Sequence, residues 1–214
     1  MGDDMKIIET SHAVEAATTL IADALRDALD ARGQATLMLS GGSSPKPVYQ
    51  RLSGLDIDWS KVRVGLVDER LDPRGSNAEL VRTTRLQDKA AEATFYPMTV
   101  ESDEGYRELM PADICVMGMG TDGHTASWFP DSPDLARAID PDTKDTVIRV
   151  DASGCGANSG YPARATLTLP AVLASRHILL LIPGAKKRDV FEHRDGLPVD
   201  TLTGSDRLTT ILGS

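Results

Sequence analysis

The stretch ICVMGMGTDGHTASWFP, Ile114 to Pro130, shows most directly how this chain of 214 residues folds. It begins with an apolar run and changes at Gly120 to a short polar loop that contains an aspartate and a histidine. An apolar run bounded by turn-forming residues is typical of a strand buried on both faces, as in a parallel sheet. After the loop we expect a helical turn over Thr125 to Phe129. The stretch therefore predicts one strand, loop and helix unit of an α/β fold.

The same pattern occurs three more times along the chain. Each time an apolar run ends in a polar loop and helical spacing follows, with runs at 35–39, 62–67 and 178–182 and helices at about 48–52, 78–89 and 185–193. Strands that alternate with helices imply parallel crossover connections. The predicted fold class is α/β: a doubly wound, mostly parallel sheet flanked by helices, with room for a small appended subdomain. Since domains have roughly 150 residues, we expect a single domain over residues 1–214.

The remaining elements follow from shorter patterns. Met5 to Glu9 alternates loosely and predicts an edge strand, and apolar residues recur at three and four from Ala13 to Ala31, which predicts a helix that ends at Gly33. Alternation predicts two further strands at 145–151 and 163–169. The glycine, serine and asparagine residues of 152–162 predict a loop between them.

Composition excludes several classes of partner. Hydrophobic residues make up 41% and charged residues 26%, which are globular proportions, and the net charge of −9 argues against nucleic acid and against anionic membrane surfaces. The first residues are acidic where a signal peptide is basic, and the longest aliphatic run, Ile178 to Ile182, is too short to cross a bilayer. With only two cysteines, we expect a cytoplasmic protein with reduced thiols. The oligomeric state cannot be inferred from one sequence.

Ligands of an open parallel sheet bind outside the carboxyl ends of its strands, where four polar loops are predicted to meet. In the loop Ser40 to Pro45, Gly41 and Gly42 allow close approach of the backbone, and Ser43 and the following helix N-terminus add donors for an anion. That anion is either a phosphate or a developing oxyanion. The loop lacks the spacing of nucleotide-binding glycine motifs, so the sequence does not favour ATP or a dinucleotide as the ligand.

His124 is the candidate general base. Its imidazole titrates near neutral pH and can take a proton from water without a metal. Asp122, two residues earlier, can orient the imidazole and by its charge favour the protonated form, whereas the predicted helix N-terminus would oppose that effect.

Cations from other loops are candidates for holding an anion. Arg70, in the Asp68-Glu69-Arg70 segment, can clamp a phosphate with two hydrogen bonds, and Arg164 precedes an apolar strand. The last long helix is predicted to begin with three cations, Lys186, Lys187 and Arg188. We expect Lys187 and Arg188 to lie on its solvent-exposed face. The carboxylates lack metal-ligand spacing, so we expect neither a metal nor any other cofactor.

Read in order, these loops resemble the 6-phosphogluconolactonase family within the glucosamine-6-phosphate deaminase/6-phosphogluconolactonase superfamily. The stretches that carry the resemblance are LSGGSSP (39–45), VDERLDPRGSN (67–77), MGMGTDGHTASWFP (117–130), ARATLTLP (163–170) and IPGAKK (182–187). The resemblance implies hydrolysis of 6-phospho-D-glucono-1,5-lactone, a step of the oxidative pentose phosphate pathway, without a cofactor. It also implies that His124 is the base and that Arg70, Arg164 and Lys186 hold the phosphate.

Two alternatives remain open at this stage. A deaminase or isomerase of sugar phosphates would share the fold, although such deaminases continue toward Phe-Asn-Glu-Pro where this chain reads Thr125 to Pro130. A non-catalytic sugar-phosphate sensor would keep the phosphate loops and dispense with His124. The chain departs from the family at its end, because 202–214 lacks the tryptophan-bearing last strand.

Overall fold

The computed structural model describes residues 6–213. Met5, where the first strand was predicted to begin, and the rest of the acidic start of the chain lie outside the described residues, as does Ser214. Ten strands, seven α-helices and several short 3₁₀ or π turns follow one another along the described part.

The elements alternate much as the sequence predicts. The strands are β1 (Lys6–Thr10), β2 (Ala35–Leu39), β3 (Val62–Leu66), β4 (Asp68–Arg70), β5 (Thr94–Phe95), β6 (Ile114–Gly118), β7 (Val147–Asp151), β8 (Ala163–Leu167), β9 (Ile178–Pro183) and β10 (Leu208–Gly213). The α-helices are α1 (Ala13–Arg32), α2 (Lys46–Ser53), α3 (Asn77–Leu80), α4 (Asp103–Leu109), α5 (Leu135–Ala138), α6 (Leu169–Ala174) and α7 (Ala185–Glu192). Short turns are η1 (Trp59–Lys61), η2 (Pro73–Gly75), the π-helical η3 (Val81–Arg85), η4 (Asp88–Glu92) and η5 (Pro198–Leu202).

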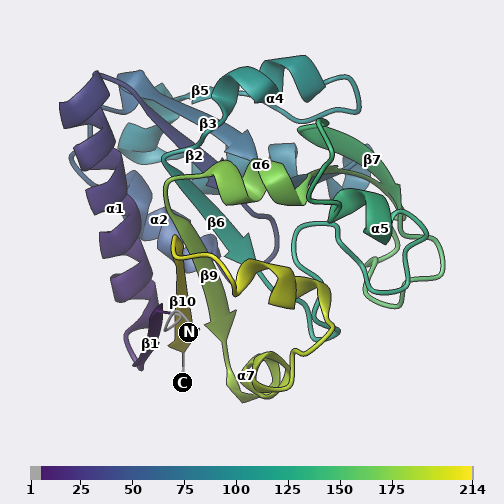
Figure 1. Ribbon diagram of the computed structural model, residues 1–214. Helices are drawn as coiled ribbons and strands as arrows, with labels where there is room; N and C mark the ends of the chain where they lie inside the picture. The colour runs from purple at the N-terminus through teal and green to yellow at the C-terminus, as the bar shows by residue number, and fades with distance from the viewer. Residues whose placement is uncertain (1–5, 214) are drawn as a thin grey trace.

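Seven strands form one parallel sheet in the order β1-β10-β9-β6-β2-β3-β5. Helices flank this sheet, and both ends of the described chain lie close together beside its β1 edge (Figure 1). The strand order reverses direction between the first half of the chain and the second, as expected of a doubly wound sheet. The predicted fold class is therefore confirmed.

A second, three-stranded antiparallel sheet has the order β4-β8-β7. The chain passes into it through Val67, whose N–H donates to Leu39 O at 2.9 Å and whose carbonyl accepts from Leu167 N at 2.8 Å. Asp68–Arg70 is thus not merely the end of β3, as predicted, but a short strand of this second sheet. The apolar side chains of the second sheet belong to the main hydrophobic core, which the second sheet shares with the first.

Three local predictions are wrong. The helix predicted over 78–89 is broken into α3, the π turn η3 and the 3₁₀ turn η4. No helix follows His124; instead Thr125 and Trp128 form an isolated antiparallel bridge. The last residues, which were not predicted as a strand, form β10 and run between β1 and β9.

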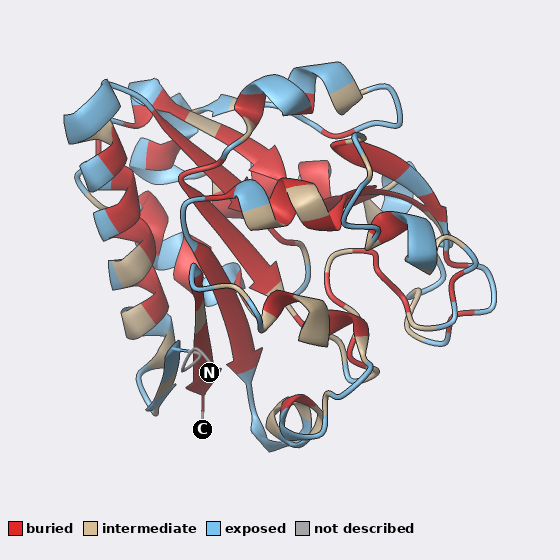
Figure 2. Cartoon of the chain, viewed as in Figure 1, coloured by how far each residue is buried: buried red, intermediate tan, exposed pale blue. Residues whose placement is uncertain are grey.

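The core lies between the sheet and its helices. Strands β2, β6 and β9 are buried almost throughout, whereas α1 and α4 are exposed on their outer faces (Figure 2). None of the described helices has both the length and the apolar composition needed to cross a membrane.

Candidate active site

A cavity of about 270 Å³ opens at the carboxyl ends of the parallel strands. Six of the predicted site residues, from four separate segments, line it: Gly41, Gly42, Ser43, Arg70, His124 and Arg164. Asp122 lies behind the imidazole, and Lys186 is exposed and does not line the cavity. The cavity also contains side chains that the sequence analysis did not single out as site residues: Ser44, Asp68, Asn77 and Lys187.

The loop that follows β2 lines one side of this cavity with free backbone donors. Within the described part of the chain, the N–H groups of residues 41–44 have no hydrogen-bond partner. Gly42 has a φ of +77°, which a side chain would disfavour, and a Cβ on Gly41 would lie 2.1 Å from Asn77 Oδ1. Glycine is therefore required at both positions, and the resulting run of amides suits an anion.

His124 and Asp122 form a close pair. His124 Nδ1 lies 2.5 Å from Asp122 Oδ1, and the side chains are 21% and 33% exposed. Burial tends to raise the pKa of Asp122, but the hydrogen bonds and charge of His124 outweigh it, so that the pKa of Asp122 is lowered. An ionised carboxylate only accepts hydrogen bonds, so Nδ1 carries a proton, and Nε2 is the acceptor in the neutral form of the ring. This tautomer is the one that a general base requires.

A tight turn, rather than a helix N-terminus, positions His124. Its carbonyl accepts from Gly120 N at 2.8 Å, and the hydroxyl of Thr125 donates to Gly118 O at 2.8 Å. A Cβ on Gly120 would lie 2.3 Å from the imidazole, so only glycine fits beneath the ring. Phe129 packs against the imidazole, with ring centroids 4.5 Å apart. The opposing effect of a helix dipole on His124, expected from the sequence, is absent from this geometry.

Arg70 is held at the cavity wall by the turn that follows β4. Its Nη1 donates to Gly75 O at 2.7 Å, and its buried Nε has no partner among the described residues. The neighbouring Glu69 does not face the cavity; its carboxylate accepts from the backbone N–H groups of Asn77 and Ala78 and fixes that turn. Arg70 therefore keeps donors for a ligand while its backbone is held rigidly.

Arg164 also lines the cavity, but most of its donors are used by the protein. Nε donates to Tyr161 O at 2.5 Å, Nη2 donates to Asn158 O at 2.6 Å, and Nη1 lies 3.5 Å from Asp68 Oδ2. Its side chain is only 3% exposed. The structure thus shows Arg164 holding the loop between β7 and β8, which covers one side of the cavity.

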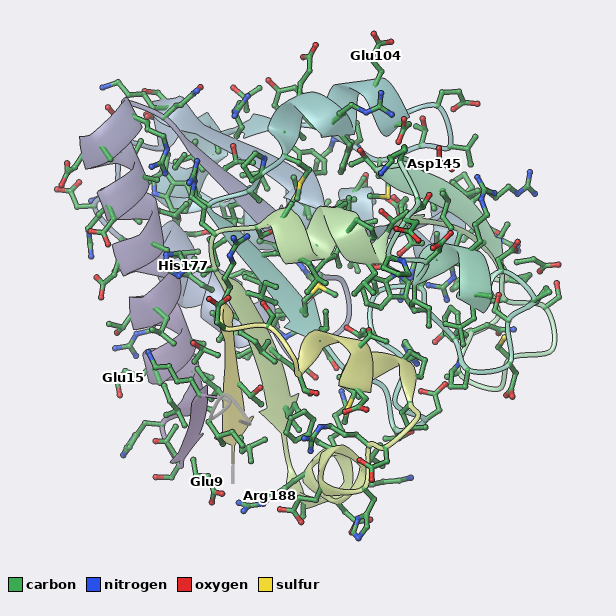
Figure 3. The ribbon with its side chains drawn as sticks, viewed as in Figure 1. Glu9, Glu15, Glu104, Asp145, His177 and Arg188 are labelled. Atoms are coloured by element: carbon green, nitrogen blue, oxygen red, sulfur yellow. The ribbon has the colours of Figure 1, made fainter. Side chains whose placement is uncertain are left out.

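Helix α7 presents Lys187, and not Lys186, to the cavity. Lys187 Nζ donates to Ser44 Oγ at 3.2 Å, and burial lowers the pKa of this lysine. Arg188, the next residue, points away from the cavity and pairs with Glu9 of β1 at 2.9 Å, near the bottom of the molecule in Figure 3. The sequence analysis expected the opposite positions for the two lysines, because periodicity alone did not show which of them faces inward.

Asp68 and Asn77 join the two sheets beside the glycine loop. Asp68 Oδ2 accepts from Ser127 Oγ at 2.8 Å, and Asn77 Nδ2 donates to Asp68 O at 3.0 Å. The position of Asp68 directly after an apolar strand is the sequence signal that could have identified this residue. No comparable signal existed for Asn77, which reaches Asp68 and Gly41 only because of the turn after β4.

Other ionisable groups are placed elsewhere. His177 precedes β9 and lies at the amino end of the sheet, beside α1 and away from the cavity (Figure 3). Among the described residues, no group of three or more His, Cys, Asp or Glu side chains is arranged to hold a metal ion. The polar chemistry of the cavity is therefore an imidazole with its carboxylate, a run of amides, and several cations.

Comparisons with known proteins agree with this arrangement. The family model described as glucosamine-6-phosphate isomerases/6-phosphogluconolactonase matches residues 9–203. The chain is 40% identical over 205 residues to the 6-phosphogluconolactonase of Rhizobium meliloti (strain 1021), which covers 89% of this chain and 86% of the relative. It resembles the crystal structure of a 6-phosphogluconolactonase from Shewanella baltica OS155 with a TM-score of 0.88 and 31% identity over 100% of both chains.

A more distant likeness concerns the fold alone. A monomeric glucosamine-6-phosphate deaminase has a TM-score of 0.73 and 18% identity, over 98% of this chain and 97% of that chain. This deaminase therefore shares the fold of the chain, and a shared fold does not by itself determine the activity.

Proposed function

The chain belongs to the glucosamine-6-phosphate isomerase/6-phosphogluconolactonase family, and from this premise we propose that His124 is the general base in the hydrolysis of 6-phospho-D-glucono-1,5-lactone. The activity is that of a 6-phosphogluconolactonase, as in the relatives that are about 40% identical over most of the chain. The observation that carries the role of His124 is its pairing with Asp122 at the wall of a cavity that also contains Arg70 and Lys187.

Hydrolysis needs a water molecule that loses a proton as it attacks the lactone carbonyl carbon, C1. His124 Nε2 accepts that proton, and Asp122 stabilises the imidazolium that results. The new bond between water oxygen and C1 converts the carbonyl into a tetrahedral oxyanion. When the oxyanion collapses, the bond between C1 and the ring oxygen breaks, and the imidazolium returns the proton to that oxygen. The product is the open-chain 6-phosphogluconate, and no cofactor is needed for any step.

We assign the phosphate of the substrate to the glycine loop. The free amides of residues 41–44 lie beside Lys187, whose ammonium touches Ser44, and Arg70 lines the same cavity. A dianion is favoured by such a set of donors and cations even in a protein whose net charge is −9. The substrate is therefore a phosphorylated lactone rather than a neutral one, and the reducing cytoplasm is the proposed place of action.

Replacement of His124 tests the role of the base. His124→Gln retains bulk and polarity but has no group that titrates, so we expect kcat to fall at least about a hundredfold. Lactone hydrolysis would be followed by acid release at constant pH, after subtraction of the spontaneous reaction. His177→Gln, at the amino end of the sheet, is the matched control and should retain wild-type turnover. A His124→Gln enzyme that kept more than about a tenth of wild-type kcat would remove His124 from the mechanism.

A further inference from the structure

Arg85 lies directly behind the glycine loop, on the side away from the cavity. It is 2% exposed and ends the π-helical turn η3, in which Leu86 N donates to Val81 O. Its Nη2 donates to the carbonyl of Gly42, and its guanidinium carbon lies 5.7 Å from the centre of the Tyr49 ring. π turns are rare and often occur at functional sites, and this one directs an arginine toward the loop.

This guanidinium is a buried charge without an acidic partner. No carboxylate among the described residues lies within 4.0 Å of Arg85, and two of its nitrogens, Nε and Nη1, have no hydrogen-bond partner. Burial lowers the pKa of Arg85, which reflects the cost of removing this charge from water. A protein that stabilised only its own fold would place an apolar side chain at such a position.

The hydrogen bond to Gly42 sets the direction of the next amide. In a trans peptide the C=O and N–H groups point in opposite directions. Since the Gly42 carbonyl points at Arg85, the N–H of Ser43 points away from Arg85. Ser43 lines the cavity, and its N–H has no partner among the described residues. Arg85 therefore holds a donor in place and polarises the peptide that carries it.

We propose that Arg85 is a positioning residue for the anionic end of the substrate. It orients the Gly42–Ser43 peptide, and its charge favours a phosphate on the opposite side of the loop without touching it. The inference rests on the proposed function for the identity of the anion. The bound substrate then provides, across the loop, the negative charge that no carboxylate of the described residues provides near Arg85.

Neutral replacements of Arg85 test this role. Arg85→Met fills similar space without charge or hydrogen bond, and Arg85→Gln keeps a donor for Gly42 without the charge. Both should weaken the binding of inorganic phosphate and raise KM for the phosphorylated lactone by about tenfold or more, with a smaller effect on kcat. Without ligand, Arg85→Met should melt no lower than wild type, because it removes an unpaired buried charge. The upward shift of Tm that phosphate produces should shrink in both variants.

The matched control is Arg82→Met. Arg82 lies on the same π turn and carries the same charge, but its side chain is exposed and does not line the cavity. Phosphate binding, measured by calorimetry, and KM should stay within about twofold of wild type in this variant. If Arg85→Met matches Arg82→Met in both quantities, the proposal is wrong. Should the methionine variant fail to fold, the same comparison with Arg85→Gln decides.

The outcomes also separate this inference from the proposed function. If the wild-type protein hydrolyses the lactone but Arg85→Met binds phosphate as tightly as wild type, the proposed function stands and the proposed role of Arg85 is wrong. A wild-type protein without lactonase activity refutes the function. Phosphate binding by the three variants still measures the effect of Arg85 on the loop in that case, because the readout does not depend on turnover.

Discussion

Two adjacent lysines at the start of α7 show how much depends on a single residue. Successive residues of an α-helix are rotated by about 100°, so Lys186 and Lys187 cannot both face the cavity. Lys187 touches Ser44 and is half-buried, whereas Lys186 is exposed. The resemblance implied a phosphate ligand at Lys186, and we now propose this role for Lys187.

Substitution of each lysine separates the two assignments. Lys187→Ala should weaken binding of 6-phosphogluconate about tenfold, since one charge-assisted contact is lost, and Lys186→Ala should leave it within about twofold. Isothermal calorimetry with the product avoids the instability of the lactone. If Lys186→Ala lost more affinity for 6-phosphogluconate than Lys187→Ala, the phosphate ligand would be Lys186.

The pKa of Lys187 adds a pH dependence to this prediction. Burial lowers the pKa from the ordinary value of 10.5, and only the protonated amine attracts phosphate. As pH rises through the lowered pKa, the charge is lost, so product affinity should begin to fall below pH 10.5. Lys187→Arg remains protonated over this range and should lose the decline that is due to Lys187. An unchanged alkaline decline in Lys187→Arg would assign it to another group.

Some site residues were predictable and others were not. His124, Arg70 and the glycines follow buried strands directly, and the carboxyl end of a parallel strand determines where such residues lie. Arg85 had no such signal, because its role depends on a carbonyl 43 residues away in sequence. The inward direction of Arg85 depends on a π turn, which helical periodicity does not reveal.

At the scale of elements, the loop between β7 and β8 forms one wall of the site. Ala157 and Ser159 of this loop line the cavity, and Tyr161 packs on Gly75, where a Cβ would lie 2.7 Å from its ring. The guanidinium of Arg164 bonds two carbonyls of the loop. Arg164 and the contact of Tyr161 with the turn after β4 therefore tie the loop to the rest of the site, in addition to the hydrogen bonds within the loop itself.

Arg164→Lys should loosen this loop. An ammonium cannot reproduce the planar fork that bonds both carbonyls, so protection of residues 152–162 from hydrogen exchange should decrease while the strands remain protected. KM should rise because the loop lines the cavity. Arg149→Lys, at an exposed position of β7, is the matched control and should change neither quantity. Loop protection equal to that of wild type in Arg164→Lys would show that the fork of Arg164 is not needed to order the loop.

The strands were more predictable than the connections between them. Continuous apolar runs identify β2, β3, β6 and β9, because strands buried on both faces contain few polar residues. β10 contains two threonines, one of them fully buried. Because of this mixed pattern the sequence did not predict β10, although it pairs with a strand on each side. The turn after β6 was predicted as a helix because Thr125 to Trp128 has no residue that excludes one. The contact of Trp128 with Leu167, which holds the turn, comes from a distant strand.

At the scale of the whole molecule, the two sheets share one core. Trp59 and Trp128 are both fully buried members of the same hydrophobic cluster, although Trp59 follows α2 and Trp128 donates its indole N–H to Leu167 of β8. The backbone N–H of Val67 bonds to the first sheet, and its carbonyl bonds to the second. An active site whose wall is built from both sheets requires that they do not separate.

The prediction of a single domain over residues 1–214 can be tested with these two tryptophans, which are the only ones in the chain. In Trp59→Phe the fluorescence reports the second sheet, and in Trp128→Phe it reports the first. If the chain is one cooperative unit, the urea transition seen by fluorescence should coincide with that seen by far-UV circular dichroism in each variant. Each variant is compared with its own dichroism, because loss of a buried indole lowers the stability of both. A fluorescence transition of Trp59→Phe that precedes its dichroism would mean that the antiparallel sheet unfolds first. The cavity would then lose Arg70 and Arg164 together while the parallel sheet remained folded.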